Sequence, residues 1–470
     1  MLFLVVLYFL HSTTSAAPIF HVLRDAIPSN LSSPSDPCTC PDQRSLWDIL
    51  WSCLATIFAC TWVSVHPNIP PLRESWLKTG LRRVELMAWA LIAPELIILW
   101  AMKQWVGARN MVQKYQGAIV CHPWTKTHAY FIQMGGFTLF EAGKPKEVLL
   151  PGQMERLLLA GKIDLPQITE EDIQDRSKGD GLAKALVVGQ TSWFVAQCIA
   201  RQAQGLILTE LELVTGAFAA LNGVMYFLWW NKPLGVRCSV PVHLLDKAKP
   251  EEERFKFRDT KGPAIKSWPW DAMSVLVVTT YYYWGTIGNI SFKGLRKAMI
   301  PIITSPWIRL RSILSSEPAQ LKVPGSVSTV STFYASTDYI TFLTDGLLVP
   351  SFTWTVAALF GGLHCAAWFF VFPSHAESMI WRVCSAAVLI IPVGILLGFI
   401  LNFFEDNATP NSGKQIFFRV LQYPLALAVF CLPVYVAARL ILLAEAFVAL
   451  RYLPSGALDV VDWLSFLPHI

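Results

Sequence analysis

Long apolar runs without charged residues are the feature that most limits how this chain can fold. Residues 347–372 and 383–404 contain no Asp, Glu, Lys or Arg. A helix rises about 1.5 Å per residue, so about 20 such residues cross the roughly 30 Å hydrocarbon core of a bilayer. Similar runs occupy 420–438, 213–230, 49–65 and 185–200. The sequence therefore predicts an all-α polytopic membrane helix bundle.

The composition favours the same class of protein. Hydrophobic residues make up 54% of the chain and charged residues 15%, whereas a soluble domain carries about 25% charged residues. A water-soluble protein with so few charges would have too little polar surface to cover itself. Disordered, collagen-like and coiled-coil classes are excluded, since each needs more charge or a different repeat.

Two further segments leave the number of spans between six and eight. Residues 86–102 are interrupted by Pro94 and Glu95, and residues 272–292 are uncharged but rich in Thr, Tyr, Gly and Asn. Each segment could cross the membrane, lie in the interface or re-enter. With the N-terminus outside, eight spans place 13 Lys and Arg in the cytosol and 25 outside, seven spans place 27 and 11, and six spans place 32 and 6. The positive-inside tendency favours six or seven spans, with 103–184 and 232–271 in the cytosol.

The N-terminal residues have the features of a secretory leader. Residues 1–17 contain a short apolar run followed by small residues suited to cleavage, although no basic residue precedes the run, which leaves an uncleaved anchor as the alternative. The Ser/Pro-rich stretch 18–44 is then a lumenal or extracellular tail, with a glycosylation sequon at Asn30. A second sequon, at Asn407, faces outside in the seven-span arrangement. We expect a location along the secretory pathway: endoplasmic reticulum, plasma membrane or vacuole.

The extramembrane residues predict a small mixed α/β polar region between the second and third apolar segments. Within 106–181, residues 129–141 predict two strands around Gly135-Gly136, followed by a short amphipathic helix. Thr169 is expected to cap an acidic helix start, although Asp172 breaks the strict capping box. Residues 232–271 predict a solvated loop. The basic and apolar stretch 293–311 suits anionic lipid headgroups, with ordinary span-end Lys and Arg as the alternative.

These features divide the chain into eight predicted parts. They are the leader 1–17, the tail 18–44, the first span with the ambiguous segment 45–105, the polar region 106–181, a helical hairpin 182–230, the charged and ambiguous region 231–346, a three-helix membrane unit 347–450 and a C-terminal tail 451–470.

Several motifs resemble an uncharacterised fungal family of multi-pass membrane proteins. They are DRSKGD at 175–180, WFVAQCIAR at 193–201, LTELELVTGAFA at 208–219 and WWNKPLGV at 229–236, with HPNIP at 66–70 and the C-terminal PSGALDVVDWLSFLPHI. The resemblance covers most of the chain. It implies the fold and the membrane placement, and it brings no activity, substrate or catalytic residue.

Polar residues inside apolar helices are the candidate functional residues, because burying them costs free energy unless they are paired or wetted. Glu95, Asn222, His364 and Glu445 are the four candidates. Glu95 lies at the interface instead if 86–102 does not cross. His364, beside Gly361-Gly362, is otherwise a hydrogen-bonded packing residue. A partner of Glu445 must come from another helix, because Arg439 and Arg451 are six residues away and off its helix face.

The sequence contains no known catalytic or cofactor motif. GxxxxGK[ST], GxSxG, HExxH and CxxC are all absent, so we predict no cofactor and no metal site, and no catalytic residue is assigned. Nucleic-acid binding has no support, since loops facing anionic lipid account for the net charge of +5. We expect a protein that handles a small molecule or lipid within the membrane, like a transporter or channel. The alternatives are an integral membrane enzyme acting on a lipid or terpenoid-like substrate, and a receptor or scaffold using its cytosolic loops.

Overall fold

The computed structural model describes nine stretches of the chain. They are residues 43–70, 74–116, 123–177, 180–258, 330–336, 338–340, 342–406, 431–454 and 456–466. Several predictions concern residues outside these stretches and stay predictions: the leader 1–17, the sequons at Asn30 and Asn407, the segment 272–292 and the lipid-binding stretch 293–311.

Six helices in the described residues are long and apolar enough to cross a membrane. They are α2 (Leu46–Phe58) continued by the π-helix η1 (Ala59–Val63), α8 (Asp180–Ala203), α9 (Glu210–Trp229), α12 (Phe342–Cys365) continued by η3 (Ala366–Phe369), α13 (His375–Asp406), and α15 (Leu432–Val448) continued by η4 (Ala449–Arg451). Five of these match the predicted apolar runs closely. The sixth differs, because α15 extends ten residues past Ala438 and so includes Arg439 within the helix.

The ambiguous segment 86–102 forms parts of two helices rather than one. Helix α3 (Trp76–Ile92) and helix α4 (Pro94–Tyr115) meet at Ala93 with a bend of 109°. Ala93 has φ −144° and ψ 64°, outside the helical region, because a residue before proline is pushed out of the α conformation and proline itself cannot donate a helical hydrogen bond. A bend greater than a right angle turns the chain back, so the pair enters the bundle and returns.

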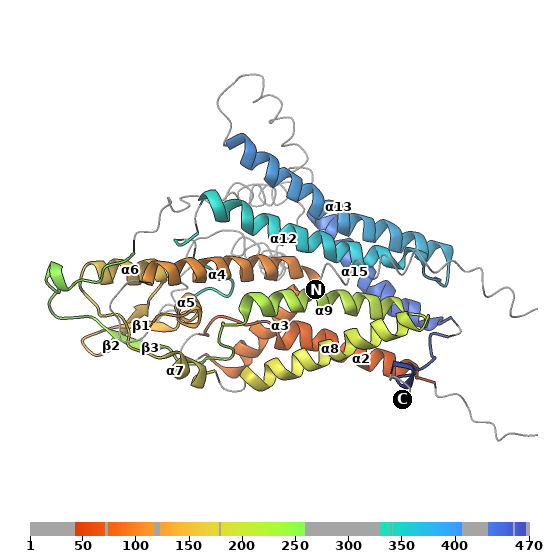
Figure 1. Ribbon diagram of the computed structural model, residues 1–470, viewed down its shortest axis with the longest axis horizontal. Helices are drawn as coiled ribbons and strands as arrows, with labels where there is room; N and C mark the ends of the chain where they lie inside the picture. Colours follow the sequence, from red (N-terminus) through yellow and green to blue (C-terminus); the bar gives the residue numbers. More distant parts are fainter. Residues whose placement is uncertain are drawn as a thin grey trace, which may run out of the picture.

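Contacts at the two ends of the bundle define the path of the chain (Figure 1). At one end, which we call the terminal end, Arg44 pairs with Glu212 and its N–H donates to the Leu458 carbonyl, and Arg451 pairs with Glu377. At the other, the sheet end, Ile69 N–H donates to the Met134 carbonyl, Lys184 donates to the Trp230 carbonyl, and Asn110 donates to Asp345. The six apolar helices run between these ends, and the first and last parts of the described chain, near Arg44 and Leu458, meet at the terminal end. This is the path that the six-span arrangement requires.

A three-stranded sheet lies at the sheet end, in the order β2-β1-β3. β1 (Phe137–Glu141) and β2 (Lys144–Val148) form an antiparallel hairpin that turns at Ala142 and Gly143, both with positive φ. The predicted hairpin around Gly135-Gly136 is wrong. Those glycines end helix α5 (Lys126–Gln133) in a Schellman motif: Gly136 N–H donates to the Phe131 carbonyl and Gly135, at φ +89°, donates to the Ile132 carbonyl.

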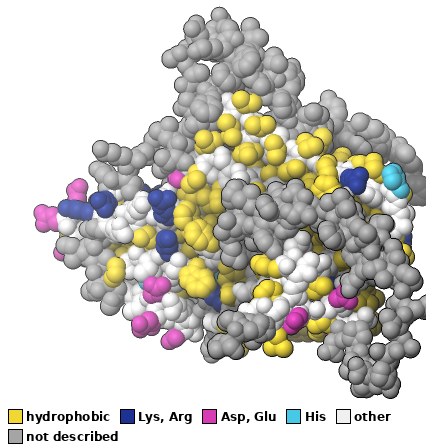
Figure 2. All heavy atoms as spheres, turned by 45° about the vertical axis from the view of Figure 1, so that its right-hand side comes forward, with side chains coloured by type: hydrophobic (Ala, Val, Ile, Leu, Met, Phe, Trp, Pro, Cys, Tyr) yellow, Lys and Arg dark blue, Asp and Glu magenta, His cyan; other side chains and the backbone are white. Residues whose placement is uncertain are grey.

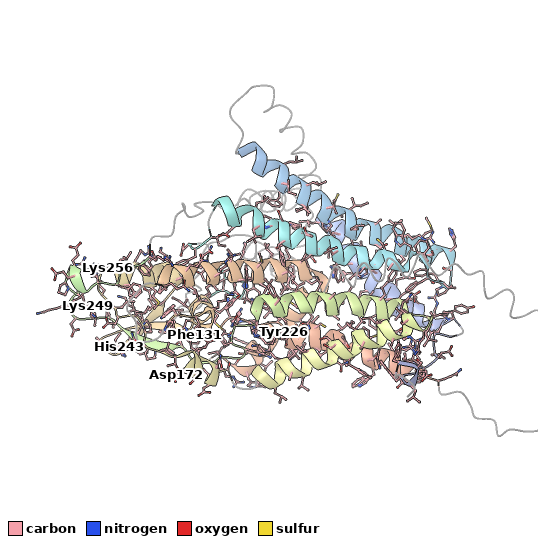
Figure 3. All side chains as sticks on the ribbon, viewed as in Figure 1. Phe131, Asp172, Tyr226, His243, Lys249 and Lys256 are labelled. Carbon is pink, nitrogen blue, oxygen red and sulfur yellow. The ribbon has the colours of Figure 1, made fainter. Side chains whose placement is uncertain are left out.

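The loop 232–271 is not simply solvated, which corrects a second prediction. Its strand β3 (Val240–His243) pairs in parallel with β1 and completes the sheet, and Phe255 and Phe257 pack around the Tyr115 ring. The polar region is therefore assembled from two separated parts of the sequence. Charged side chains of this loop, such as Lys249 and Lys256, extend away from the helices at the sheet end (Figure 3).

Short helices complete the sheet end. They are α6 (Pro151–Leu159), the expected amphipathic helix, α7 (Glu170–Asp175) and the 3₁₀ turn η2 (Glu251–Glu253); another 3₁₀ turn, η5 (Leu464–Phe466), lies near the C-terminus. The expected defect in the cap of α7 is absent. Asp172 accepts from the Thr169 N–H at 3.0 Å and donates its own N–H to the Thr169 hydroxyl at 3.1 Å, so Asp closes the capping box that Glu or Gln usually forms.

The outward faces of the helices are strongly apolar. Large hydrophobic side chains are exposed on α2, α8 and α13, for example Trp51 at 75%, Leu186 at 64% and Ile390 at 64%. Figure 2 shows hydrophobic side chains gathered across the middle of one face, with charged side chains mainly at its left-hand edge. Exposed hydrophobic side chains in such number are typical of a surface that contacts lipid or another protein.

We predict that Gly361 is required for the close approach of α12 and α13. A Cβ at Gly361 would lie 2.6 Å from the Val388 carbonyl oxygen, whereas a Cβ at Gly362 meets nothing within 4 Å. Gly361→Ala should lower the free energy of unfolding by about 1–3 kcal/mol through overpacking, while Gly362→Ala should be neutral or slightly stabilising. Unfolding of the detergent-solubilised variants measures both, and equal effects would show that the two helices have room to separate.

Candidate functional site

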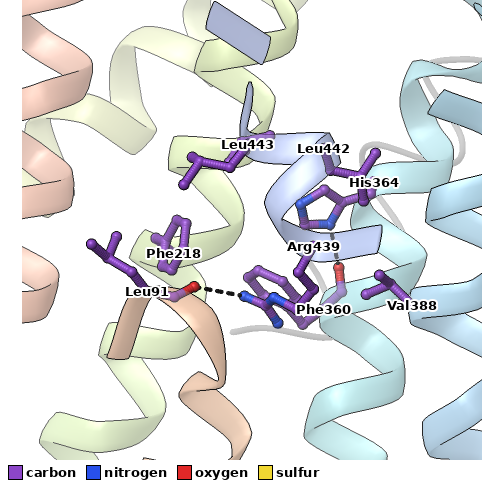
Figure 4. A pocket seen from close by; sticks show the side chains of 9 residues that line it. Leu91, Phe218, Phe360, His364, Val388, Arg439, Leu442 and Leu443 are labelled. Atoms are coloured by element: carbon purple, nitrogen blue, oxygen red, sulfur yellow. Dashed lines mark hydrogen bonds between the residues drawn. The ribbon is translucent and has the colours of Figure 1, made fainter. Parts of the chain in front are cut away.

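A buried ion pair joins the break between α3 and α4 to helix α15. Arg439 Nη1 lies 3.3 Å from Glu95 Oε2, and both side chains are 5% exposed. The same nitrogen donates to the Tyr435 hydroxyl at 3.1 Å, and Arg439 Nη2 donates to the Leu91 carbonyl at 3.4 Å. The guanidinium also lies over the Phe360 ring of α12, 4.2 Å from its centre. Arg439 therefore contacts three separate helical elements (Figure 4).

The helix break explains why these partners meet. The last carbonyl groups of α3 have no partner within their own helix, and the Leu91 carbonyl is satisfied by Arg439. Glu95 occupies the first turn of α4, where the positive end of the helix dipole favours a carboxylate. Tyr435 and Arg439 are four residues apart and so lie on the same face of α15. The break at Pro94 therefore leaves the Leu91 carbonyl available and places Glu95 at a helix start, and Arg439 contacts both groups.

A small cavity lies beside the ion pair. His364 and Arg439 provide its polar lining, and apolar side chains of α9, α12, α13 and α15 close it, among them Phe218 and Phe360. Its volume is about 10 Å³, which is room for about one water molecule. His364 Nδ1 donates to the Phe360 carbonyl at 2.9 Å, and the His364 carbonyl accepts from Trp381 Nε1 at 2.9 Å (Figure 4). His364 is thus hydrogen-bonded, and it also faces this cavity.

The other two predicted residues lie further along the bundle. Asn222 is one turn beyond Phe218 on α9, towards the sheet end, and Glu445 is two residues beyond Leu443 on α15, towards the terminal end. Both are buried, and among the described residues Asn222 Oδ1 and Glu445 Oε1 have no hydrogen-bond partner. The structure therefore brings Glu95 and His364 together around Arg439, and it places Asn222 and Glu445 on either side of that centre.

Glu210 and Glu212 begin α9, as their position before an apolar run suggests. Thr209 caps the helix, and the Glu212 carboxylate accepts a hydrogen bond from the Thr209 N–H at 2.9 Å. Glu212 also forms the ion pair with Arg44 at the terminal end. Glu210 and Glu445 both lie towards the terminal end, at the start of α9 and in the last turns of α15.

A second buried cation, Lys232, lies at the sheet end and was not predicted. It has no exposed surface. Its amine donates to the His66 carbonyl at 2.5 Å, to Gln104 Oε1 at 2.9 Å and to Asn68 Oδ1 at 3.3 Å. The rings of Trp100 and Trp229 lie 4.4 and 4.7 Å from the amine. An ammonium has three N–H donors and is attracted to aromatic faces, so this cage fits the charged form of the side chain.

Burial disfavours the charged forms of Lys232 and His66 at the sheet end. Burial lowers the pKa of the Lys232 amine well below its usual value, and no carboxylate in the described part of the chain forms an ion pair with it. Burial also lowers the pKa of His66 to about 3, an effect that Lys232, Lys184 and Arg83 increase. His66 is therefore neutral at physiological pH, while the oxygens and rings of the cage compensate Lys232 in place of a negative charge.

The sequence contains a signal for Arg439 but none for the inward position of Lys232. Arg439 lies just outside the predicted run 420–438, yet the apolar sequence LILLAEAFV continues directly after it. Lys232 follows the interfacial sequence FLWW, where a lysine normally extends to water. Only the folded structure reveals that it turns inward between two tryptophans.

Comparisons with known proteins supply a family and no activity. The sequence model of a family of unknown function (DUF8562) matches residues 16–250 and 348–470, which is more than half of the chain. No curated protein and no solved structure matches the chain. Within the described residues, no group of three or more His, Cys, Asp and Glu side chains is arranged to hold a metal ion.

We predict that Glu95 and Arg439 are strongly coupled. Removing one partner leaves an uncompensated buried charge, so Glu95→Leu or Arg439→Met should each lower the free energy of unfolding by about 3–5 kcal/mol. The double variant should be less damaged than the sum of the two. Reversible unfolding in mixed micelles measures the cycle, and the pair Glu141–Lys146, in which both side chains are 50% exposed, is the control, with an expected effect below about 1 kcal/mol. Additive effects of the two core substitutions would mean that the pair is not an energetic unit.

Proposed function

The chain belongs to this family of unknown function, and we propose from its structure that it is an integral membrane protein that binds and moves a small charged solute at the Glu95–Arg439 pair. The family match and the fold show a protein of unknown function with several helices that are long and apolar enough to cross a membrane. The membrane placement, the solute and the movement are the proposal.

Three observations support placement in a membrane. Six helices have the necessary length and apolar character, and their outer faces expose large hydrophobic side chains. The path of the described helices between the two ends matches the six-span arrangement, for which the sequence assigns 32 of the 38 Lys and Arg to the cytosolic side. A bilayer explains all three, because it needs apolar outer faces, closed backbone hydrogen bonding and a basic cytosolic side.

The buried ion pair is the observation that supports solute handling. Ionisable side chains within a membrane bundle are costly, and they commonly mark solute or ion pathways. Interrupted helices at membrane depth are a frequent way to build a solute site, because the break exposes backbone groups and a helix dipole. Glu95 at the start of α4 and the Leu91 carbonyl at the end of α3 are such groups. A cationic group of the solute would compete with Arg439 for the Glu95 carboxylate. An anionic group would compete with Glu95 for the Arg439 guanidinium.

The buried polar residues form a line along the bundle. Glu445 and Glu210 lie nearest the terminal end, Arg439 with Glu95 and His364 lies in the middle, and Asn222 follows towards the sheet end. The cavity in the middle holds about one water, so the described conformation is closed. A solute would enter after α15 or the α3–α4 pair moves, as a mechanism of alternating access requires.

The enzyme and the receptor or scaffold alternatives predict different results in the same tests. An enzyme needs acid and base groups that converge on a cavity of substrate size, whereas the cavity at His364 and Arg439 is the size of one water. A receptor or scaffold would function through the sheet end and would tolerate changes at the ion pair.

We predict that the sheet end and the terminal end face opposite sides of the membrane. In a variant without its native cysteines, single cysteines at Lys144 and Lys247 should react with an impermeant maleimide from one side, and a cysteine at Asp462 should react from the other. All three positions are exposed. Reaction of Asp462→Cys from the same side as Lys144→Cys would contradict the six-span path.

Glycosylation offers an independent readout of the same path. α13 ends at Asp406, directly before the sequon at Asn407, and on the six-span path it ends on the side of the sheet. Only Asn30 should then carry a glycan, so Asn30→Gln should increase the mobility of the protein on a gel and Asn407→Gln should leave it unchanged.

We predict that transport depends on both members of the ion pair. Proteoliposomes on a solid-supported membrane should give transient currents when a small carboxylate, phosphate, amine or proton concentration is raised, for at least one of these classes. Glu95→Gln and Arg439→Gln should reduce that current about tenfold or more, which corresponds to about 1.4 kcal/mol of lost binding. Glu74→Gln, at an ion pair outside the core, should retain it.

The contrary results separate the classes. Absence of a protein-dependent current for every class would refute transport of a charged solute. Equal currents in the wild type and both core variants would place the pathway elsewhere. Conversion of a lipid extract by the purified protein would instead support the enzyme alternative.

A further inference from the structure

A polar pocket of about 360 Å³ opens at the sheet end, where α8 begins and α9 ends. Its lining includes the side chains of Thr127, Gln174 and Ser177 on one side and Lys184, Trp230 and Asn231 on the other. We call these six residues the rim pocket. It lies apart from the Glu95–Arg439 pair, which is in the middle of the bundle, and it is large enough for a small polar group rather than a single water.

Positive charge is concentrated around the rim pocket. Lys184 and Lys232 both belong to its lining, and both act electrostatically on His66, as does Arg83. Arg237 in turn repels Arg83. Lys184 is the accessible cation of the lining, because Lys232 has no exposed surface, and Arg83 and Arg237 act at a distance without lining the pocket. Such a concentration of like charge favours an anion as a ligand.

One carboxylate reaches the lining. Glu170 Oε1 accepts from the Thr127 hydroxyl at 2.6 Å and from Gln174 Nε2 at 3.4 Å. These bonds hold it on the α5–α7 side of the pocket, opposite Lys184. Lys184 donates to the Trp230 carbonyl at 3.0 Å, and its amine lies 5.7 Å from the centre of the Trp230 ring. The Lys184 side chain is therefore positioned by the C-terminal end of α9.

The surface next to the rim pocket is apolar and exposed. Trp230 is 58% exposed, and Phe227 on the preceding turn of α9 is 66% exposed. A free phosphate ion gains nothing from such neighbours. A phospholipid does, since its headgroup can occupy a polar pocket while its acyl chains cover adjacent hydrophobic side chains. Tryptophan beside a cation is also typical of the membrane interface.

We propose that the rim pocket binds the phosphate-bearing headgroup of an anionic phospholipid, with Lys184 as the principal ligand of the phosphate. The acyl chains lie against Phe227 and Trp230. The polar side chains of Thr127, Gln174 and Asn231 contact the remainder of the headgroup. The inference rests on the membrane placement proposed above and is independent of what the ion pair handles.

The test is native mass spectrometry of the full chain in detergent, titrated separately with phosphatidylglycerol, phosphatidylinositol and phosphatidylcholine. Wild-type protein should bind an anionic lipid about tenfold more tightly than phosphatidylcholine, as the loss of one charge-assisted contact predicts. Lys184→Gln should abolish most of this preference, and the exposed Arg237→Gln should weaken it. Lys144→Gln, which removes an equal charge from the distant β1–β2 hairpin, is the matched control and should retain it.

Each other result overturns the proposal. Equal binding of anionic and zwitterionic lipids would show that the pocket does not select phosphate charge, and an equal loss in Lys144→Gln would reduce the effect to overall charge. Inorganic phosphate or glycerol phosphate competing as well as the whole lipid would make the ligand a soluble phosphate. Arg237→Gln keeps the inference testable if Lys184→Gln does not fold. Labelling that contradicts the six-span path, with lipid selectivity intact, would reject the proposed orientation and leave the lipid site standing.

Discussion

Arg439 holds together the parts of the bundle that the chain itself leaves unconnected. Its guanidinium contacts the Leu91 carbonyl on α3, the Glu95 carboxylate on α4, and the Phe360 ring on α12. Without a cation at this place, the break at Pro94 would leave a buried carboxylate and a buried carbonyl unsatisfied, at a cost of several kcal/mol. The interrupted helix pair is therefore tolerable only because α15 supplies Arg439.

Much of the fold could be predicted from local sequence, because the rules involved are local. Apolar runs of about 20 residues predict helices well, since the length and the composition of one segment are sufficient. The break at Pro94 was also visible, as was the cap at Thr169. Each of these features depends on residues within a few positions of one another.

Predictions failed where the partner lies far away in the sequence. The residues Gly135-Gly136 suit a hairpin turn and a helix stop equally well by composition, and the packing of α5 against the sheet decides between them. β3 was missed because it pairs with a strand about 100 residues earlier. At the candidate site, Glu95 and His364 could be named from polarity alone, but Arg439 lies just outside the predicted run 420–438. Its role depends on how far α15 extends, which a hydropathy limit set at Ala438 could not give.

The closing contacts of the terminal end have a consequence for how the molecule is assembled. Arg44 donates to the Ala457 carbonyl, 413 residues later in the chain, and Arg201 donates to the carbonyls of Ala457 and Asp459. Both arginines also have partners that come earlier in the chain, because Arg44 pairs with Glu212 and Arg201 donates to the Ile207 carbonyl. Residues 457–459 follow η4, which ends at Arg451, so the contacts that close the terminal end form only after the six apolar helices have been made. A chain interrupted before residue 457 lacks this closing layer although its apolar helices are complete.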